Sequence, residues 1–349
     1  MVRRLATPAV VAVILGTLAV PKARAVTIDW VTVGDAGNEA DTTGQPNPAG
    51  AVNYAYRIGK YEVTIQQYTD FLNAVDPNGT NPYGLYNNSM GTNGNIRGIL
   101  FSSGSASGQK YSPIGSPNRP ITYVSWFDAA RFANWMQNGQ GSGSTETGAY
   151  TLVDGQTSGW ASAKNPGATF YIPTENEWYK AAFYKGGSAY ARYWDYAMKS
   201  NNGPSNSTST DGRTNQANFL DGVYTVTQSF DYDSNQNYLT DVGAFTNSAS
   251  YYGTFDQTGN VYEWNDLTGA AGSSRGLRGG GWNTGTLVYL SRFARGVYDP
   301  SYEFNDYGFR LASPASLVAV PEIDPAGMGS VLALVTGALG LIERRRKRA

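Results

Sequence analysis

The 349-residue chain contains neither cysteine nor histidine. Without cysteine it has no disulfide, no thiolate nucleophile and no cysteine-type zinc or iron–sulfur site. Without histidine it has no Ser-His-Asp triad, no imidazole metal ligand and no side chain that ordinarily titrates near neutral pH. A metal ion must therefore be held by oxygen, which favours Ca²⁺ or Mg²⁺, and acid–base chemistry is left to carboxylates, lysine or tyrosine.

Basic runs are also lacking between the two ends of the chain. The ends hold 9 of the 26 basic and 3 of the 27 acidic residues, so residues 26–321 carry 17 and 24, a net charge of −7. Nucleic-acid binding depends on clustered lysine and arginine, so no nucleic-acid partner is expected. Aromatic residues are plentiful instead, with 25 Tyr and 8 Trp.

Residues 1–25 have the pattern of a secretory signal peptide. Arg3 and Arg4 precede the apolar run 9–20, and Ala23-Arg24-Ala25 forms a small-x-small cleavage site. The run is too short to cross a membrane comfortably, which disfavours a membrane anchor. We therefore expect export.

Residues 314–349 have the pattern of a sorting tail. The 17-residue uncharged run 326–342, followed by the basic cluster 344–348, predicts one transmembrane helix with a stop-transfer signal. Together with Val320-Pro321-Glu322, this tail resembles the bacterial PEP-CTERM sorting signal, although Ile323 replaces the usual second proline. The resemblance implies an exosortase-type processing protease as a partner. It also implies transient membrane anchoring and delivery to the cell surface or the extracellular matrix.

Three helices are predicted from their capping residues. Thr64 begins one helix, Ser125 with Asp128 forms a capping-box pattern, and Thr174 with Glu177 forms another. A β-like run precedes each helix, at 56–63, 121–124 and 170–172. Gly/Asn/Ser-rich stretches separate them, at 76–118, 137–168 and 198–216, and no fixed repeat is present. The chain therefore predicts a single loop-rich α+β domain over 26–313.

Six motifs in order resemble the sulfatase-modifying factor family, whose founding activity is the formylglycine-generating enzyme. The resemblance spans about 50–312 and implies a compact, loop-rich variant of the C-type lectin fold. The motifs are Ile58-Gly59-Lys60-Tyr61-Glu62-Val63-Thr64, Pro120-Ile121-Thr122-Tyr123-Val124-Ser125-Trp126-Phe127-Asp128-Ala129-Ala130, Ile172-Pro173-Thr174-Glu175-Asn176-Glu177-Trp178, Gly259-Asn260-Val261-Tyr262-Glu263-Trp264, Leu277-Arg278-Gly279-Gly280-Gly281-Trp282-Asn283 and Gly308-Phe309-Arg310.

The chemistry of that family does not carry over with the motifs. The resemblance implies two copper-binding cysteine thiolates between the Arg-Gly-Gly-x-Trp and Gly-Phe-Arg motifs, but residues 282–292 contain no cysteine. Hydroxyls and amides cannot replace thiolates for Cu(I), so no copper and no catalytic residue of this type are expected. The ergothioneine branch of the family uses histidine-bound iron, which this chain cannot supply.

The same resemblance implies a structural Ca²⁺. Asp256 and Glu263 would supply carboxylates, and Gly259 and Val261 would supply backbone carbonyls. The alternative is that Glu263 makes a local cap or salt bridge, for instance with an arginine. A second family site would involve Asn218 and the Phe219 carbonyl, with carboxylates somewhere in 231–233.

Five residues lie where the resemblance implies a ligand groove: Trp282, Asn283, Tyr289, Arg292 and Arg295, with Tyr298 and Tyr302 nearby. If the aromatic side chains are exposed they would stack on sugar or peptide, and if buried they are core. The arginines have a structural alternative, because a guanidinium fork also locks loops.

Two functions remain open from the sequence. One is an exported surface or matrix protein that keeps the fold without the oxidase chemistry and acts by binding a glycan or peptide, or by structural assembly. The other is a divergent enzyme using the same groove, for which Glu303 with Asp306 or Asp299 are the candidate acidic residues.

Overall fold

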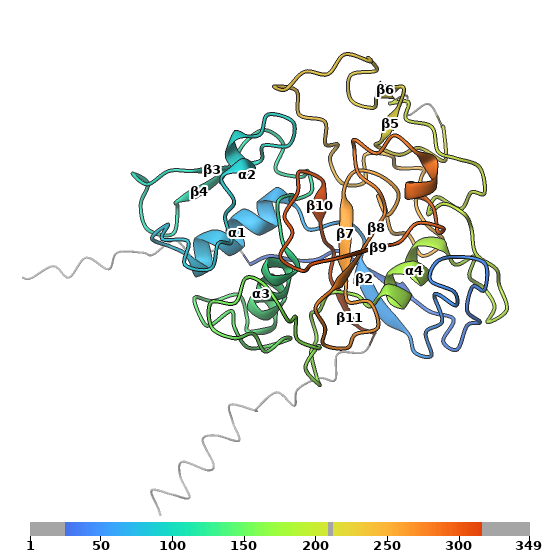
Figure 1. Ribbon diagram of the computed structural model, residues 1–349, viewed down its shortest axis with the longest axis horizontal. Helices are drawn as coiled ribbons and strands as arrows, with labels where there is room; N and C mark the ends of the chain where they lie inside the picture. Colours follow the sequence, from blue (N-terminus) through green and yellow to red (C-terminus); the bar gives the residue numbers. More distant parts are fainter. Residues whose placement is uncertain (1–24, 209–211, 316–349) are drawn as a thin grey trace, which may run out of the picture.

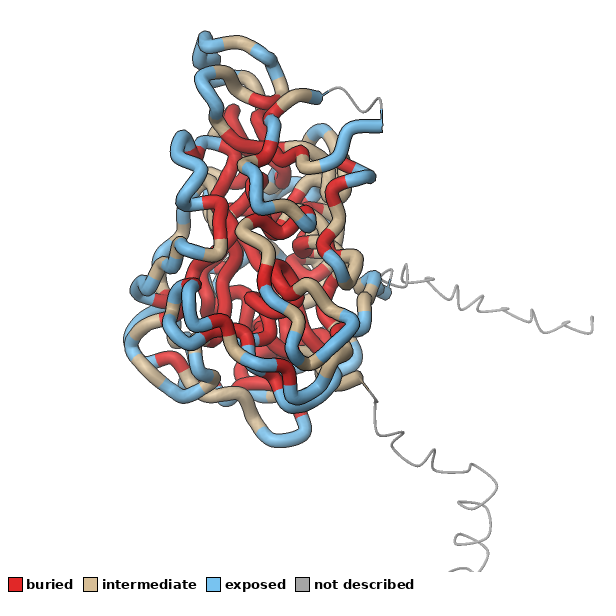
Figure 2. The backbone as a smooth tube through the Cα atoms, turned by 90° about the vertical axis from the view of Figure 1, so that its right-hand side faces the viewer, coloured by how far each residue is buried: buried red, intermediate tan, exposed pale blue. Residues whose placement is uncertain are grey.

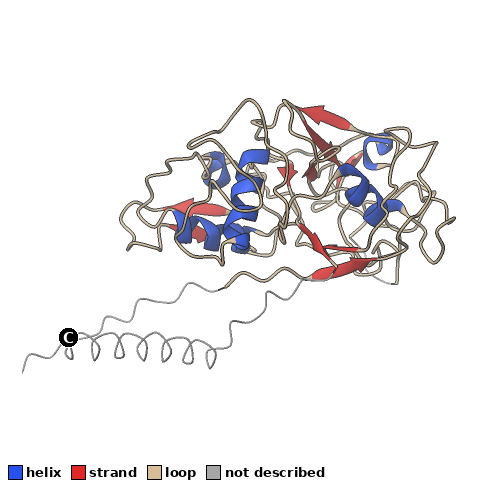
Figure 3. Cartoon of the chain, turned by 90° about the horizontal axis from the view of Figure 1, so that it is seen from below, coloured by secondary structure: helices blue, strands red, loops and turns tan. Residues whose placement is uncertain are grey.

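The computed structural model describes residues 25–208 and 212–315. Within these ranges short helices and strands are separated by long loops (Figure 3). The helices gather to either side of a central sheet rather than forming a layer of their own (Figure 1). The predicted loop-rich α+β class is confirmed.

One three-stranded sheet joins the beginning of the domain to its end. It contains β1 (Trp30–Val33), β2 (Tyr56–Gly59) and β11 (Ala312–Pro314) in the order β1-β2-β11. Both pairings are antiparallel, and Tyr56 of the central strand is opposite Val33 on one side and Pro314 on the other. The two ends of the described domain are thus fixed to the same strand.

A second sheet positions the motifs of the C-terminal half. Its order is β10 (Tyr307–Gly308), β7 (Tyr262–Asn265), β8 (Arg275–Arg278) and β9 (Gly296–Tyr298). Strand β10 runs parallel to β7, and the other pairs are antiparallel. Two short hairpins, β3 (Ile99–Phe101) with β4 (Tyr111–Pro113) and β5 (Leu220–Asp221) with β6 (Val223–Tyr224), complete the strands.

The three predicted helices are confirmed together with their caps. They are α1 (Ile65–Val75), α3 (Trp126–Gln137) and α4 (Glu175–Phe183). Each has a complete capping box, in which the hydroxyl of Thr64, Ser125 or Thr174 accepts the backbone N–H three residues later. Two single-turn segments were not predicted: α2 (Ser89–Thr92) and the 3₁₀ turn η1 (Leu287–Leu290).

The three β-like runs gave only one strand of the described sheets. Residues 56–59 of the first run form β2, whereas 121–124 and 170–172 make isolated contacts and the strand prediction there was wrong. Tyr123 adopts a φ of 56°, which extended strands do not contain. Tyr171 makes one antiparallel bridge to Ala312, so burial of this run comes from packing rather than from a ladder.

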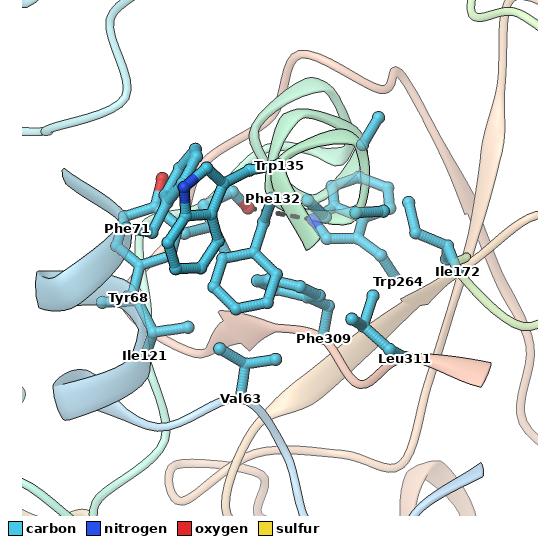
Figure 4. Close-up of a cluster of buried hydrophobic side chains, with 14 of the residues drawn as sticks. Val63, Tyr68, Phe71, Ile121, Phe132, Trp135, Ile172, Trp264, Phe309 and Leu311 are labelled. Atoms are coloured by element: carbon cyan, nitrogen blue, oxygen red, sulfur yellow. Dashed lines mark hydrogen bonds between the residues drawn. The ribbon is translucent and has the colours of Figure 1, made fainter. Parts of the chain in front are cut away.

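The largest hydrophobic core lies between α1, α3 and the strands that carry the conserved-looking motifs of the sequence. Phe132 of α3 lies 5.4 Å, centroid to centroid, from both Phe71 of α1 and Phe309 (Figure 4). Trp264 is fully buried, and its Nε1 donates to the Val124 carbonyl over 2.9 Å. Aromatic packing therefore ties the helices to the central sheet in a chain without disulfides.

Polar side chains hold the long loops. Asp76 at the end of α1 accepts hydrogen bonds from the backbone of Thr80 and Asn81 and from the Tyr111 hydroxyl. Asp266 similarly accepts from the indole of Trp126 and the hydroxyl of Tyr150. These bonds satisfy backbone and side-chain groups that would otherwise be buried unpaired, and the buried interior continues into the loops (Figure 2).

Both predicted targeting segments lie outside the described residues, except for Ala25 and residues 314–315 at their inner ends. Within the ranges given above, the helices are too short or too polar to cross a membrane. The signal peptide, the tail helix and its processing remain predictions.

Candidate functional site

Trp282 is a core residue rather than a groove residue. Its exposed fraction is 3%, and its indole stacks on Tyr238 with ring centroids 5.1 Å apart and planes 4° apart. The indole Nε1 donates to the Asn305 carbonyl over 3.3 Å. Trp282 therefore offers no face to a ligand, which is the buried alternative that the sequence left open.

Asn283 and Tyr289 lie on the surface that follows Trp282. Tyr289 belongs to η1 and is 54% exposed, and the exposed Asn283 side chain hydrogen-bonds the carboxylate of Asp306. The buried Thr284 between them donates weakly to the Tyr262 hydroxyl over 3.4 Å. The stretch where the family resemblance implies thiolates thus presents a phenol, amide and hydroxyl.

Arg292 and Arg295 lock loops together. The Arg292 guanidinium binds Asp195 at 2.7 Å and also contacts Asp41, which joins three distant segments. Arg295 binds Glu175 at 2.9 Å, and the same carboxylate is 2.7 Å from Arg278. Each guanidinium already has its carboxylate partner, so these two arginines have the structural role rather than a ligand role.

An exposed aromatic surface was only partly foreseen. We define the aromatic platform as Tyr298, Tyr302 and Phe304, whose exposed fractions are 41%, 46% and 47%, with the half-buried Tyr307 beneath them. Their rings form a closed circuit with centroid separations of 5.0–6.4 Å. The sequence analysis named Tyr298 and Tyr302 but missed Phe304 and Tyr307, although aromatics at four of ten positions were a usable signal.

The backbone holds the aromatic platform against the start of α3. The Pro300 carbonyl accepts from Trp126 N–H and the Phe304 carbonyl accepts from Tyr123 N–H, at 2.9 and 3.0 Å. In Figure 1 this segment is the orange-to-red connection from β9 to β10, which passes beside α3. Because both ends of the connection are strands of one sheet, the rings are mounted on a rigid base.

Three carboxylates flank the platform. Asp299 accepts from Ser301, Glu303 accepts from Asn87 at 2.6 Å, and Asp306 accepts from Asn283. Burial, with the nearby Asp128 carboxylate, raises the pKa of Glu303 to about 7, and burial raises the pKa of Asp306 to about 6. Hydrogen bonds from Ser301 instead lower the pKa of Asp299.

The residues implied as calcium ligands lie in two segments that touch. Asn218 N–H₂ donates to Asn260 Oδ1, and the Asn218 carbonyl accepts from Asn260 N–H over 2.8 Å. Gly259 has a φ of 88°, and a Cβ placed on it would lie 2.5 Å from the Asn218 carbonyl oxygen. Glycine is therefore required for this close approach. Phe219 is buried, and its carbonyl accepts the Thr225 hydroxyl.

Glu263 is paired with an arginine. Its carboxylate accepts two bonds from Arg310, of 2.5 and 2.6 Å, and one of 2.7 Å from the Trp178 indole. Glu263 and Arg310 are both fully buried. This is the local salt bridge that the sequence left as the alternative to calcium, and a cation bound by this carboxylate would have to displace Arg310.

The surroundings of Arg310 nevertheless hold an excess of negative charge. Glu62 is buried, its Oε2 has no hydrogen-bond partner, and it lies 3.9 Å from Arg310. Burial, reinforced by the nearby Asp256, raises the pKa of Glu62 well above its ordinary value, and burial raises the pKa of Asp256 to about 6.

An oxygen-preferring cation near Asp256 would balance this charge, with the Gly259 and Val261 carbonyls as further donors. Within the described ranges, however, no group of three or more acidic side chains surrounds a point that would hold a metal ion. Calcium in this loop stays a prediction.

The fold and the ordered motifs define a sulfatase-modifying-factor domain. The family description "Sulfatase-modifying factor enzyme 1-like domain" (FGE-sulfatase) matches residues 6–315, so the chain belongs to this family. A search of curated proteins found no match.

Several solved structures are similar to this chain. The crystal structure of CarF has 22% sequence identity and a TM-score of 0.51, covering 83% of this chain and 99% of that one. Variable protein 1 of Treponema denticola has 20% identity and a TM-score of 0.47, with coverages of 84% and 97%. PvdO from Pseudomonas aeruginosa has 18% identity and a TM-score of 0.40, with coverages of 82% and 92%. At these identities the similarity to CarF shows a shared fold and nothing about activity.

Proposed function

We propose that this chain is an exported binding protein that retains the family domain without its copper–thiolate chemistry. The observation that carries the proposal is the aromatic platform, which is exposed on the face that follows Trp282. Large aromatic rings on a rigid surface are costly to expose to water, and they are typical of sites that bind another molecule. The ligand classes that suit such a surface are glycan and peptide.

The loss of the oxidase chemistry is supported by the donors that remain. Thr284, Asn283 and Tyr289 offer hard oxygens and an amide where the family resemblance implies thiolates. Cu(I) prefers soft sulfur ligands, and none is present in the chain. The platform and the missing sulfur together favour recognition over oxidation.

Export and surface delivery complete the proposal. The signal-like residues 1–25 support secretion, and the tail 314–349 supports transient membrane anchoring followed by exosortase-type processing. A cell-surface or extracellular-matrix protein would meet extended polymers there, which suits a binding or structural role.

The enzymatic alternative has less support from the site. Glu303, Asp299 and Asp306 are hydrogen-bonded to three different neutral side chains. The acidic group that influences Glu303 is Asp128, whose carboxylate is fixed in the α3 capping box. An acid–base pair acting on one bond requires two carboxylates facing a common substrate position, and these contacts do not create one.

A direct assay separates oxidation from binding. The purified chain is incubated with a cysteine-containing sulfatase peptide, Cu(I) and O₂, and the product is analysed by mass spectrometry. We expect the cysteine to remain unconverted. Formation of the aldehyde above the level of a protein-free control would overturn the proposed loss of chemistry.

The binding role is tested by screening the purified chain on glycan and peptide arrays. We expect hits that are lost in Tyr302→Ala and Phe304→Ala but kept in Tyr190→Ala, since Tyr190 is 75% exposed elsewhere. Equal loss in all three variants, or binding unaffected by the platform variants, would contradict a platform-based function. Circular dichroism of each variant checks that the fold is intact.

A further inference from the structure

The charges around the aromatic platform are all of one sign once internal ion pairs are removed. Residues 287–308 contain five charged side chains: Arg292, Arg295, Asp299, Glu303 and Asp306. The two arginines are neutralised by carboxylates of other segments. In the described part of the chain, the three carboxylates have no ion-pair partner within 4 Å and are held by Ser301, Asn87 and Asn283.

The rings themselves add to this negative potential. An aromatic face carries partial negative charge and attracts cations by about 0.5–2 kcal/mol. Tyr298, Tyr302 and Phe304 therefore favour a ligand that is positively charged. An anionic ligand would be repelled by the rings and by the carboxylates alike.

The geometry also restricts the shape of the ligand. Phe304 and Tyr307 have ring centroids 5.0 Å apart, and Tyr302 and Phe304 are 5.9 Å apart. Rings this close are in mutual contact, so nothing fits between them and a ligand must lie across their outer faces. Rigid rings with flat C–H faces suit such a surface, because they lose less conformational entropy on binding than flexible chains do.

From the flat aromatic surface and its unpaired carboxylates together, we propose that the platform binds an amino-sugar polymer whose amines are at least partly free of acetyl groups. This inference rests on the proposed binding function and specifies its ligand class. The pyranose faces lie over Tyr298, Tyr302 and Phe304, and the ammonium groups face Asp299 and Glu303. A lysine-rich peptide shares the charge, but its strongly hydrated ammonium groups are carried on flexible stems, so it matches the surface less well.

Isothermal titration calorimetry of the purified chain with four hexamers tests the inference. The probes are β-1,4-linked glucosamine, its fully N-acetylated form, galacturonate and hexalysine, each at pH 6 and low salt. We expect the glucosamine hexamer to bind at least about tenfold tighter than the acetylated one, to weaken with added salt, and the galacturonate hexamer not to bind.

Matched variants assign the two contributions. Tyr302→Ala should weaken both glucosamine and acetylated hexamers. Glu303→Gln and Asp299→Asn should weaken only the glucosamine hexamer, by roughly two- to fivefold each as expected for exposed charge pairs. Asp154→Asn, which removes an exposed carboxylate elsewhere, should leave all affinities unchanged.

The outcomes distinguish the inference from the function. If the acetylated hexamer bound as tightly as the free amine with the same dependence on Tyr302, or if galacturonate were preferred, the charge inference would fail and the binding function would stand. If hexalysine bound tightest, the ligand would be a peptide and the glycan class would be overturned. If no probe bound and the arrays gave no platform-dependent hit, both proposals would fail.

Discussion

The guanidinium of Arg310 clasps the carboxylate of Glu263, with Nη2 2.6 Å from Oε1 and Nε 2.5 Å from Oε2. The pair joins the strand β7 to the segment that leads into β11. Arg310 also donates to the Gly59 and Phe255 carbonyls, so one buried cation connects both sheets to the loop before Asp256.

Removal of one partner of this pair should be strongly destabilising. We expect Arg310→Met to lower the free energy of unfolding by about 3–5 kcal/mol, because the Glu263 charge is left buried and uncompensated. Urea denaturation followed by tryptophan fluorescence measures the loss. Arg57→Met, at a half-buried arginine bonded only to Ser313 and the Pro314 carbonyl, is the control and should cost about 1 kcal/mol or less. Similar losses in both variants would contradict a special role for the pair.

Calcium should stabilise the folded chain through Asp256. We expect the melting temperature to rise when calcium replaces EDTA, with a gain of about 2.7 kcal/mol at a concentration one hundred times the dissociation constant. Asp256→Asn should reduce the gain, whereas Asp154→Asn should not. A melting temperature that is identical in EDTA and in calcium would show that Arg310 alone satisfies this loop.

Trp282 and Tyr289 should respond oppositely to truncation although they are only seven residues apart. Trp282→Ala leaves a cavity beside Tyr238 and should cost about 3–5 kcal/mol of unfolding free energy. Tyr289→Ala removes an exposed side chain and should change stability by no more than about 0.5 kcal/mol. Thermal denaturation of both variants is the measurement, and a tolerated Trp282→Ala would refute the buried placement.

The free energy of unfolding should fall as pH rises from about 5 to 7. The pKa of Glu303 is raised to about 7 from an ordinary value of 4.5, chiefly by burial. The folded state therefore holds this proton more tightly than the unfolded state, and its stabilising effect is lost as the pH passes through that interval. Asp306, with a pKa of about 6, acts in the same direction. The carboxyls with lowered pKa, Asp41 and Asp299, titrate below about 3.8 and do not change charge in this range.

Glu303→Gln tests this pH dependence. We expect the variant to flatten the decrease in melting temperature between pH 5 and 8, with a difference of about 1–3 kcal/mol across the range. Asp154→Asn provides the control, because its carboxylate is exposed. An unchanged slope in Glu303→Gln would mean that other groups set the pH response.

Local chemistry made the helices predictable. The caps at Thr64, Ser125 and Thr174 are hydrogen bonds between residues three positions apart, so the sequence contains both partners side by side. Runs such as 121–124 and 170–172 lack this property. Whether a run becomes a strand depends on a partner far along the chain, and here Tyr171 met only a single residue of β11.

The sequence alone determined the absence of soft metal ligands, the order of the family motifs and the three capped helices, because each follows from residue identity or from neighbours within a helical turn. Only the tertiary structure decided that Trp282 is buried while Tyr302 is exposed, that Glu263 meets Arg310, and that four aromatic rings meet on one surface. These are contacts between residues on different elements, and the residue types permitted either outcome. Packing selects among such alternatives, because the burial of one ring and the pairing of one charge depend on every segment that closes around them.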